Sequence, residues 1–328
     1  MPRVTVIIVS YNAGADRLER MLASLAAQTF TDFEILLLDN NSTDGCVDDL
    51  PVMQNMRLIR SEENLGFAGG VNRAATQARG DWLALLNPDA VADPDWLTNL
   101  MRGTQRYPDT KSFGAVQLNA DDPALLDGLG DVYHATGIAW RGGFGQSAQA
   151  RPDTDREIFA PCGAAALYER ATFEKLGGLE ESFFCYHEDV DLGARLRLDG
   201  GRSIMIADAV ILHEGSGTTG RYSDFTIYHG ARNRIWTFIR VMPPPLFWPI
   251  LPIHILINFA FVLRGLITGT GPAYFHGMKD GFLKADKAWA ARRALQQTRK
   301  VSALDFLKAL SWSPVRLLGR KPVMREIK

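Results

Sequence analysis

The chain has 328 residues, of which 22% are charged and 46% are hydrophobic, and its formal net charge is −1. This composition is typical of a globular protein and excludes a disordered chain, a collagen-like repeat and a small disulfide scaffold. The length predicts two domains or one large domain. Because a nearly neutral chain has no overall attraction for polyanions, we expect no nucleic-acid partner.

The distribution of charge and cysteine indicates where the protein works. Residues 272–328 contain 13 Lys and Arg but only 4 Asp and Glu, so this segment is basic and suits an anionic surface. The three cysteines are too scattered for a zinc site or a disulfide framework, which favours a reducing compartment. The chain opens on the strand-like residues 4–9 rather than on a signal peptide, so we expect a cytoplasmic protein.

The first third of the chain alternates strand-like and helix-like patterns. The predicted order is strand 4–9, helix 18–25, strand 33–38, strand 57–60, helix 68–78 and strand 82–86. Asp16 is the expected N-cap of the first helix, and Asp93 and Pro94 are expected to begin a further helix. This alternation predicts an α/β fold with an open, mostly parallel, doubly wound sheet, in which ligands bind at the carboxyl ends of the strands.

The middle of the chain is less regular. Residues 119–156 are rich in Asp, Gly and Gln and predict a long loop or a small hairpin over the sheet. Regular structure is expected to return with a strand-like segment at 158–168 and helices at 170–176 and 187–198. The last of these helices carries three acids in its first turn, which suits the helix dipole. Two short strands are expected at 202–207 and 210–213.

Polar residues follow the predicted strands where a ligand would bind. Asp39 can accept hydrogen bonds from a ribose or a base edge, or it can be a turn acid. Asn87 and Asp89 offer an amide and a carboxylate oxygen two residues apart, which suits a hard cation such as Mg²⁺, or they can form a simple turn. The Gly-rich residues 64–70 allow a backbone to approach a phosphate, or they form a tight loop. Asp93 and Asp95 spell a D-x-D, which we interpret as a helix cap.

Several common enzyme motifs are absent from the sequence. It contains no G-x-x-x-x-G-K-[ST], no G-x-G-x-x-G after the first strand, no H-E-x-x-H and no G-x-S-x-G. These absences exclude a P-loop NTPase, a dinucleotide-binding domain of the usual kind, a zincin and an α/β-hydrolase.

Seven short segments form a recognisable series: VIIVSYN at 6–12, LDNNSTDG at 38–45, NLGFAGGVN at 64–72, LNPDA at 86–90, FCYHEDVDL at 184–192, VILH at 210–213 and GARNR at 230–234. Together they resemble an inverting family 2 glycosyltransferase with a GT-A fold, close to the bacterial rhamnosyltransferase-like group. The resemblance spans residues 3–235. It implies transfer of a sugar, rhamnose among the candidates, from a nucleoside-diphosphate sugar to a hydroxyl of a glycan or lipid-linked acceptor in cell-surface polysaccharide synthesis.

The resemblance also assigns residues. It implies that the donor is bound by Ser10, Tyr11, Asn12, Asp39, Ser42, Gly69, Asn72, Asn87 and Arg232. Asp189 is the implied general base, with Glu188 beside it in the Glu-Asp motif. Asp89 and His213 are the implied ligands of a divalent cation, Mg²⁺ or Mn²⁺, and the implied donor is a UDP- or dTDP-sugar. Asn87 stands where the family usually has the first acid of its D-x-D, so the site has one negative charge fewer.

These residue types suit the chemistry. A sugar hydroxyl is a weak nucleophile unless a base takes its proton in the transition state. A cation can stabilise the charge that develops on the leaving diphosphate. A single displacement with one carboxylate opposite the leaving group gives inversion.

The C-terminal segment differs from the rest. Residues 241–263 contain no Asp, Glu, Lys or Arg but five prolines, so an uninterrupted helix is expected only from about residue 253. With the basic tail, this favours interfacial or re-entrant membrane insertion over a buried core helix, a homodimer surface or a true span. We therefore expect a glycosyltransferase domain at 1–235, with a nucleotide-sugar half at 1–118 and an acceptor half at 119–235. A helical, membrane-associating extension at 236–328 would place the protein on the inner face of the cytoplasmic membrane.

Two other functions fit the sequence less well. A nucleotide-sugar hydrolase or a nucleotidyltransferase could use a similar sheet, but a nucleotidyltransferase needs a Gly-rich basic loop after the first strand, where residues 13–20 offer only Arg17 and Arg20. A non-catalytic membrane-associated protein would have no need of Asp89, Asp189 and His213 together.

Overall fold

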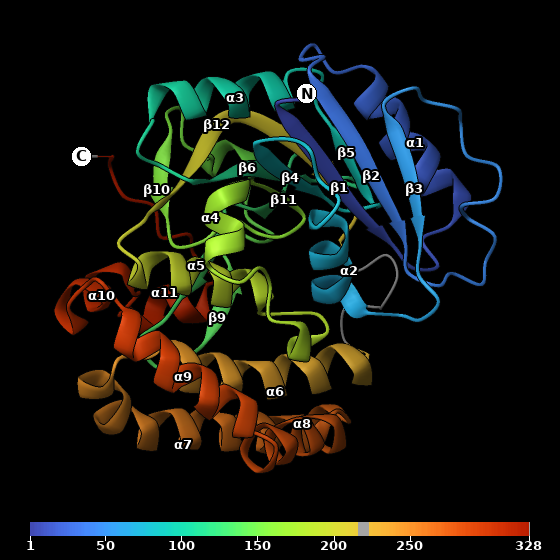
Figure 1. The fold of residues 1–328 in the computed structure, drawn as a ribbon. Helices are drawn as coiled ribbons and strands as arrows, with labels where there is room; N and C mark the ends of the chain where they lie inside the picture. Colours follow the sequence, from blue (N-terminus) through green and yellow to red (C-terminus); the bar gives the residue numbers. More distant parts are fainter. Residues whose placement is uncertain (216–222, 328) are drawn as a thin grey trace.

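A ten-stranded mixed sheet forms the centre of the computed structural model, which describes residues 1–215 and 223–327 (Figure 1). The strand order is β10-β12-β6-β11-β4-β1-β2-β3, with β5 paired to β12 and β7 paired to β6. The strands of this sheet are β1 (Val4–Ser10), β2 (Phe33–Asp39), β3 (Met56–Arg60), β4 (Trp82–Leu86), β5 (Ala90–Ala92), β6 (Ser112–Asn119), β7 (Leu126–Gly128), β10 (Arg156–Ile158), β11 (Ala165–Glu169) and β12 (Ser203–His213).

The N-terminal part of the sheet is parallel. Strand β1 pairs in parallel with β2 on one side and with β4 on the other, and β2 pairs in parallel with β3. Strand β11 then runs antiparallel to both β4 and β6. The predicted α/β fold with a mostly parallel, doubly wound sheet is therefore confirmed. The weakly periodic residues 119–156 contain the small hairpin β8 (Asp131–Tyr133) and β9 (Ala139–Arg141).

Helices cover both faces of the sheet because its strands are apolar on both sides. Val6 and Ile8 of β1 pack with helices α1 (Ala15–Ala26) and α3 (Trp96–Arg106) in one core. Ile7 and Val9 of the same strand pack with α2 (Gly66–Ala75), α4 (Arg170–Lys175) and α5 (Glu188–Leu198) in another core. The period-two alternation of a strand thus divides one apolar run between two helical layers.

Two predicted helix caps are wrong. Helix α1 is capped by Gly14 at φ 80°, and Asp16 lies in its first turn, where an acid suits the helix dipole without closing the helix. Helix α3 begins at Trp96 rather than at Pro94, because Asp93 first accepts the Asp95 backbone N–H in a turn of its own. The two predicted strands near 202–213 are one strand, β12, whose pairing register shifts between Ile206 and Val210.

The remaining helices form a second layer below the sheet (Figure 1). They are α6 (Asp224–Val241), α7 (Pro244–Thr268), α8 (Gly271–Leu283), α9 (Asp286–Thr298), α10 (Ala303–Ala309) and α11 (Pro314–Leu318). Phe247 of α7 and Phe306 of α10 share one core with Tyr133, Phe159 and Phe183 of the preceding chain. The predicted boundary at residue 235 falls inside α6, and the C-terminal helices are packed into the fold on one side.

Helix α7 is longer than the sequence predicts. It begins at Pro244 instead of near residue 253 and continues through Pro249 and Pro252. The carbonyl groups that these prolines leave without an intrahelical donor belong to residues 245 and 248, which are exposed at the start of the helix, so the missing bonds cost little there. This helix is apolar and long enough to cross a membrane. An 18-residue window of the helix has a mean hydropathy of 2.0, yet only 22% of that window is buried in the protein.

A buried ion-pair cluster joins the two layers. Asp191 of α5 is fully buried and accepts hydrogen bonds from Arg195, at 2.6 Å, and from Arg240 of α6, at 2.7 Å. Arg240 also contacts Glu180, at 2.6 Å, in the loop before α5. Burial would raise the pKa of Asp191, but the two guanidinium groups outweigh it and lower that pKa.

We expect Asp191→Ala to reduce the free energy of unfolding by about 3–5 kcal/mol, because it leaves two buried guanidinium groups without their carboxylate. The matched control is Asp199→Ala at the end of the same helix, whose partners Lys175 and Lys300 are exposed. That surface pair should contribute no more than about 1 kcal/mol. Urea denaturation of both variants measures the difference, and equal losses would contradict the assignment.

Candidate active site

The ends of β1 and β2 form one wall of the site. Ser10 and Asp39 are the last residues of these strands, and they lie side by side in the parallel register. Both are buried. Oδ1 of Asp39 accepts the backbone N–H of Ser42 at 3.0 Å, and Oδ2 lies 3.7 Å from Arg60. Asp39 therefore orders the turn that follows it and holds a negative charge at the strand end.

Hydrogen bonds tie the two loops after these strands together. The Asn12 N–H donates to Oγ of Ser42 at 3.1 Å, and Oδ1 of Asn12 accepts the Thr43 N–H at 2.7 Å. Asn12 has φ 48°, in the left-handed region, which an asparagine tolerates better than most residues. Tyr11, which lies between Ser10 and Asn12 in the chain, is 39% exposed. The structure thus brings together five of the residues that the resemblance assigns to donor binding, namely Ser10, Tyr11, Asn12, Asp39 and Ser42.

The Gly-rich segment leads into α2 and touches the loop before α5. Gly66 has φ +70°, and a Cβ there would lie 2.4 Å from the Phe184 carbonyl oxygen, so no larger residue fits without a shift. Ala68 donates its N–H to that same carbonyl at 3.1 Å. The side chain of buried Asn40 binds the Leu65 N–H and the Gly66 carbonyl. Gly66 therefore allows the backbone before α2 to approach the backbone of the loop before α5.

Gly69 and Asn72 both lie within α2, beyond this contact. Gly69 is buried, with Leu65 as its nearest neighbour. The side-chain amide of Asn72 donates to the Leu179 carbonyl and to Glu181, and its oxygen accepts the Leu179 N–H at 2.9 Å. The contacts of Asn72 shown by the structure hold the loop after α4 against α2.

Asn87, Asp89 and His213 converge at the ends of β4 and β12. Nε2 of His213 lies 3.2 Å from Oδ1 of Asp89 and 3.4 Å from Nδ2 of Asn87. On the other side of the ring, Nδ1 lies 2.7 Å from Oδ2 of Asp127, which in turn contacts Arg141 at 2.5 Å. His213 is 2% exposed. Its ring is therefore oriented from behind by a carboxylate.

This donor set fits a divalent cation. When Nδ1–H donates to Asp127, the Nε2 lone pair faces the Asp89 carboxylate, and imidazole with carboxylate is a combination that Mn²⁺ accepts. Burial would lower the pKa of His213, but its hydrogen bonds to Asp127 and Asp89 outweigh burial and raise it. Two carboxylates around one imidazole thus favour a positive charge at this position, whether proton or metal.

Asp189 lies in the first turn of α5, facing β11. Its Oδ2 accepts the Gly163 N–H at 3.1 Å, and its Oδ1 accepts the Val190 N–H at 2.8 Å. The residue after Gly163, Ala164, accepts the backbone N–H of Asn87 at 3.1 Å. Adjacent residues of one segment thus contact the Asp189 carboxylate and the end of β4.

The loop before α5 is strained. Phe184, Tyr186 and His187 all have φ between 66° and 73°, a conformation that costs about 1–3 kcal/mol for each non-glycine residue. Nδ2 of Asn233 in α6 donates to the carbonyls of Phe183, Cys185 and Tyr186. Arg232 donates to the Phe183 carbonyl at 2.9 Å and stacks on Trp236, so the contacts it makes in the structure support this loop.

Glu188 precedes Asp189 and differs from it in environment. It is 5% exposed, and its Oε2 has no hydrogen-bond partner among the described residues. Burial, and then the charge of Asp189, raise the pKa of Glu188 well above its usual range. A carboxyl group held in its neutral form cannot accept a proton at neutral pH, so the geometry favours Asp189 as the base of the pair.

Sequence comparison gives the chain its family. The model of the family "Glycosyl transferase family 2" matches residues 5–177. The chain is 32% identical over 243 residues to an N-acetylglucosaminyl-diphospho-decaprenol L-rhamnosyltransferase of Mycobacterium tuberculosis, covering 66% of this chain and 77% of the relative. The chain belongs to glycosyltransferase family 2. A second relative, the O-antigen chain rhamnosyltransferase WbaN of Salmonella anatum, is 25% identical over 70% of this chain and 73% of its own length.

Structural comparison places the family 2 enzyme among GT-A folds. The mannosyltransferase PcManGT of Pyrobaculum calidifontis, solved in complex with GDP-Man and Mn²⁺, superposes with a TM-score of 0.53 at 19% identity. The superposition covers 97% of this chain and 87% of that one. The predicted family and GT-A fold are therefore confirmed.

Sequence reasoning missed four residues of this glycosyltransferase site. Asp127 and Arg141 support His213, and Asp131 and Gly163 face Asp189. Asp127, Asp131 and Arg141 lie in the Asp- and Gly-rich residues 119–156, for which the sequence predicted a long loop or a small hairpin. In the structure they belong to strands that are only three residues long. Asp127 and His213 are 86 residues apart, so no local spacing joins them. The acidic residues within 119–156, which include Asp127 and Asp131, were the sequence signal that could have pointed to this part of the site.

We expect EDTA to weaken binding of a nucleoside diphosphate to the glycosyltransferase, and Asp89→Ala to have the same effect, because either removes the cation that would neutralise the diphosphate. Calorimetric titration with UDP and dTDP, with and without Mg²⁺ or Mn²⁺, measures both. Asp93→Ala is the matched control, since Asp93 is exposed and belongs to a turn. Unchanged affinity in EDTA and in Asp89→Ala would show that protein cations hold the diphosphate.

Proposed function

We propose that the protein transfers a sugar, L-rhamnose in the first instance, from a UDP- or dTDP-sugar to a hydroxyl of a lipid-linked saccharide with inversion at the anomeric carbon. The observation that carries this proposal is the Asp189 carboxylate, fixed by two backbone N–H groups and joined through residues 163–164 to the end of β4. The rhamnosyltransferase names of two relatives support the donor sugar, and the decaprenol-linked substrate in one of those names supports the acceptor.

The proposed reaction divides between two clusters. Asp189 accepts the proton of the acceptor hydroxyl as that oxygen attacks the anomeric carbon, while the bond to the diphosphate breaks. Asp89 and His213 would hold a divalent cation, Mg²⁺ or Mn²⁺, which stabilises charge on the leaving diphosphate. Asp39 and the loops after β1 and β2 orient the nucleoside. In this scheme the anionic base and the cation-binding group act at separate positions around the sugar.

We expect Asp189→Asn to lower kcat by about two to four orders of magnitude while nucleotide affinity persists, because the amide cannot take a proton. Glu188→Gln is the comparison, since Glu188 is held neutral and an amide replaces it without loss of charge. Transfer to a lipid-linked saccharide, with the product anomer assigned by NMR, measures rate and stereochemistry. Wild-type turnover by Asp189→Asn would exclude it as the base.

The same assay separates the alternative functions. Release of free sugar without an acceptor would identify a nucleotide-sugar hydrolase. Exchange of pyrophosphate into the nucleotide sugar would identify a nucleotidyltransferase. Retention of the donor configuration in the product would exclude the single displacement proposed here.

We also propose that α7 and α8 rest on an anionic membrane surface, on the cytoplasmic side. Buried residues of α7, including Phe247, recur along the face packed on the protein. The opposite face exposes Trp248, Leu256, Phe259, Leu263 and Ile267. Exposed cations lie on the same helix and on the two that follow, at Arg264 of α7, Lys279 of α8 and Lys287 of α9. Apolar and basic groups together suit the interface of an anionic bilayer.

The position of this face agrees with a lipid-linked acceptor. Helix α6 packs against α7 and α8 on their protein-facing side (Figure 1). Arg232 and Asn233 of α6 hold the loop before the proposed base, whereas Arg234 of the same helix donates to Asn258 of α7 at 2.7 Å. A bilayer on the exposed face of α7 would therefore be separated by the C-terminal helix layer from the loop that precedes Asp189.

We expect the protein to sediment with phosphatidylglycerol vesicles at low salt and to be released only partly at high salt, because the apolar contribution remains. Leu256→Asp should weaken binding by roughly tenfold or more, since it removes the burial of a leucine. Val52→Asp, at a 99% exposed residue near β3, is the matched control. Equal binding by both variants, or a stable dimer that Leu256→Asp dissociates, would overturn the membrane assignment.

A further inference from the structure

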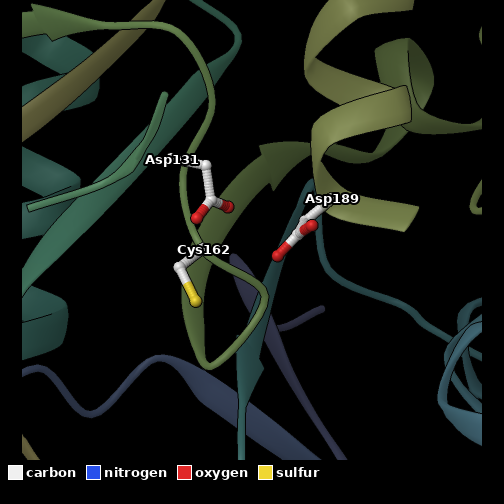
Figure 2. A group of neighbouring side chains, drawn as sticks. All are labelled: Asp131, Cys162 and Asp189. Carbon is white, nitrogen blue, oxygen red and sulfur yellow. The ribbon is translucent and has the colours of Figure 1, made fainter. Parts of the chain in front are cut away.

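A second carboxyl group lies beside the proposed base. Asp131 belongs to β8 and is 7% exposed. One of its oxygens, one oxygen of Asp189 and Sγ of Cys162 all lie within 4.8 Å of one another. Figure 2 shows Asp131 and Cys162 on one side and Asp189 of α5 on the other, with their polar atoms turned toward the same space.

Asp131 lacks the contacts that a buried carboxylate needs. Its Oδ2 is buried and has no hydrogen-bond donor among the residues that the structure describes. A buried ionised carboxylate without a donor, close to a second carboxylate, is strongly unfavourable. A proton on Asp131 removes the repulsion and gives this carboxyl group an O–H donor close to the Asp189 carboxylate.

We propose that Asp131 is a positioning residue for the catalytic base, a protonated carboxylic acid whose O–H donates a hydrogen bond to the Asp189 carboxylate. The proposal rests on the proposed function, in which Asp189 is the base. Asp131 touches neither donor nor acceptor in this scheme. It acts by fixing the orientation of the Asp189 carboxylate and by keeping a negative charge away from it.

The environment decides which of the two carboxyl groups carries the proton. Asp189 is partly exposed and accepts two backbone N–H groups, from Gly163 and Val190. Asp131 is buried and accepts none at Oδ2. Burial first, and then the charge of Asp189, raise the pKa of Asp131 well above its usual range.

The other groups around the pair agree with this charge distribution. Arg141 is the nearby cation, and its guanidinium contacts Asp127 directly. Burial raises the pKa of the Cys162 thiol and of the Tyr168 phenol, so both stay neutral. Glu188, on the α5 side, is neutral for the same reason. A protonated thiol and a neutral acid are poor metal ligands, which disfavours a metal ion at this cluster.

The test compares kcat/KM across pH for the wild type, Asp131→Asn, Asp131→Ala and Cys162→Ala in the transfer assay. Asp131→Ala removes the donor and should lower kcat about ten- to a hundredfold, the usual worth of a hydrogen bond to a charged group. Asp131→Asn keeps a donor and should recover most of that loss. Cys162→Ala changes the packing of the same cluster and should leave the profile as in the wild type.

The alkaline side of the profile separates positioning from a structural effect. In the wild type, kcat/KM should fall as the pH rises through the range in which Asp131 loses its proton, because two carboxylates then repel each other. Asp131→Asn cannot ionise and should lose this decline. A residue that serves stability alone would lower the melting temperature of both Asp131 variants without moving the alkaline side.

A spectroscopic measurement stands apart from activity. Infrared difference spectra at neutral pH should contain a protonated carboxylic acid band that Asp131→Asn lacks and Glu188→Gln retains in part. If the wild type transfers sugar and this band is unchanged in Asp131→Asn, the proposal is wrong although the proposed function stands. Stoichiometric bound metal that Asp131→Asn loses and Asp89→Ala retains would also overturn it. If the wild type transfers no sugar, the band still decides the protonation of Asp131.

Discussion

The buried carboxylate of Asp191 is the interaction on which the arrangement of the site depends. It binds Arg195 within α5 and Arg240 of α6, and Arg240 also reaches Glu180 ahead of the helix. One anion therefore fixes α5, the helix that carries Asp189 in its first turn, to the layer of helices below the sheet. Desolvation makes such a cluster costly to form, so its main consequence is a unique orientation of α5 rather than extra stability.

That orientation matters because the loop before α5 cannot hold itself. Its left-handed residues Phe184, Tyr186 and His187 are held by Asn233, which donates to three carbonyls of the loop. Gly66 contributes as well, because its lack of a side chain admits the Phe184 carbonyl. Strain at one loop is thus offset by contacts from α2 and α6 together. Helix α6 also binds α7. The packing of the apolar C-terminal helices and the position of Asp189 therefore depend on the same helix.

The sequence was informative where function is carried by contiguous residues. Strand ends could be predicted because alternation is a local signal, and they led to Asp39 and Asp89. Asp189 was assigned by the resemblance to family 2 glycosyltransferases, through the contiguous segment 184–192. Contacts between residues of different strands were not predictable. Asp127, on a strand of three residues, reaches His213 only because β6 pairs with both β7 and β12. Helix α7 was shortened in the prediction because each proline was weighed as a helix breaker, although exposed first turns tolerate the loss of a backbone donor.

Arg141 shows how the two halves of the site are coupled. It lies on β9, contacts Asp127 behind His213, and its charge also acts on Asp131 and Asp189. A single guanidinium thus interacts with Asp127, which orients the His213 ring, and with the two acids Asp131 and Asp189. Asp127 and Asp131 are both buried, so one guanidinium leaves buried negative charge that a proton or a further cation has to offset. In the two proposals made above, Asp131 carries the proton, and Asp89 and His213 would hold the cation.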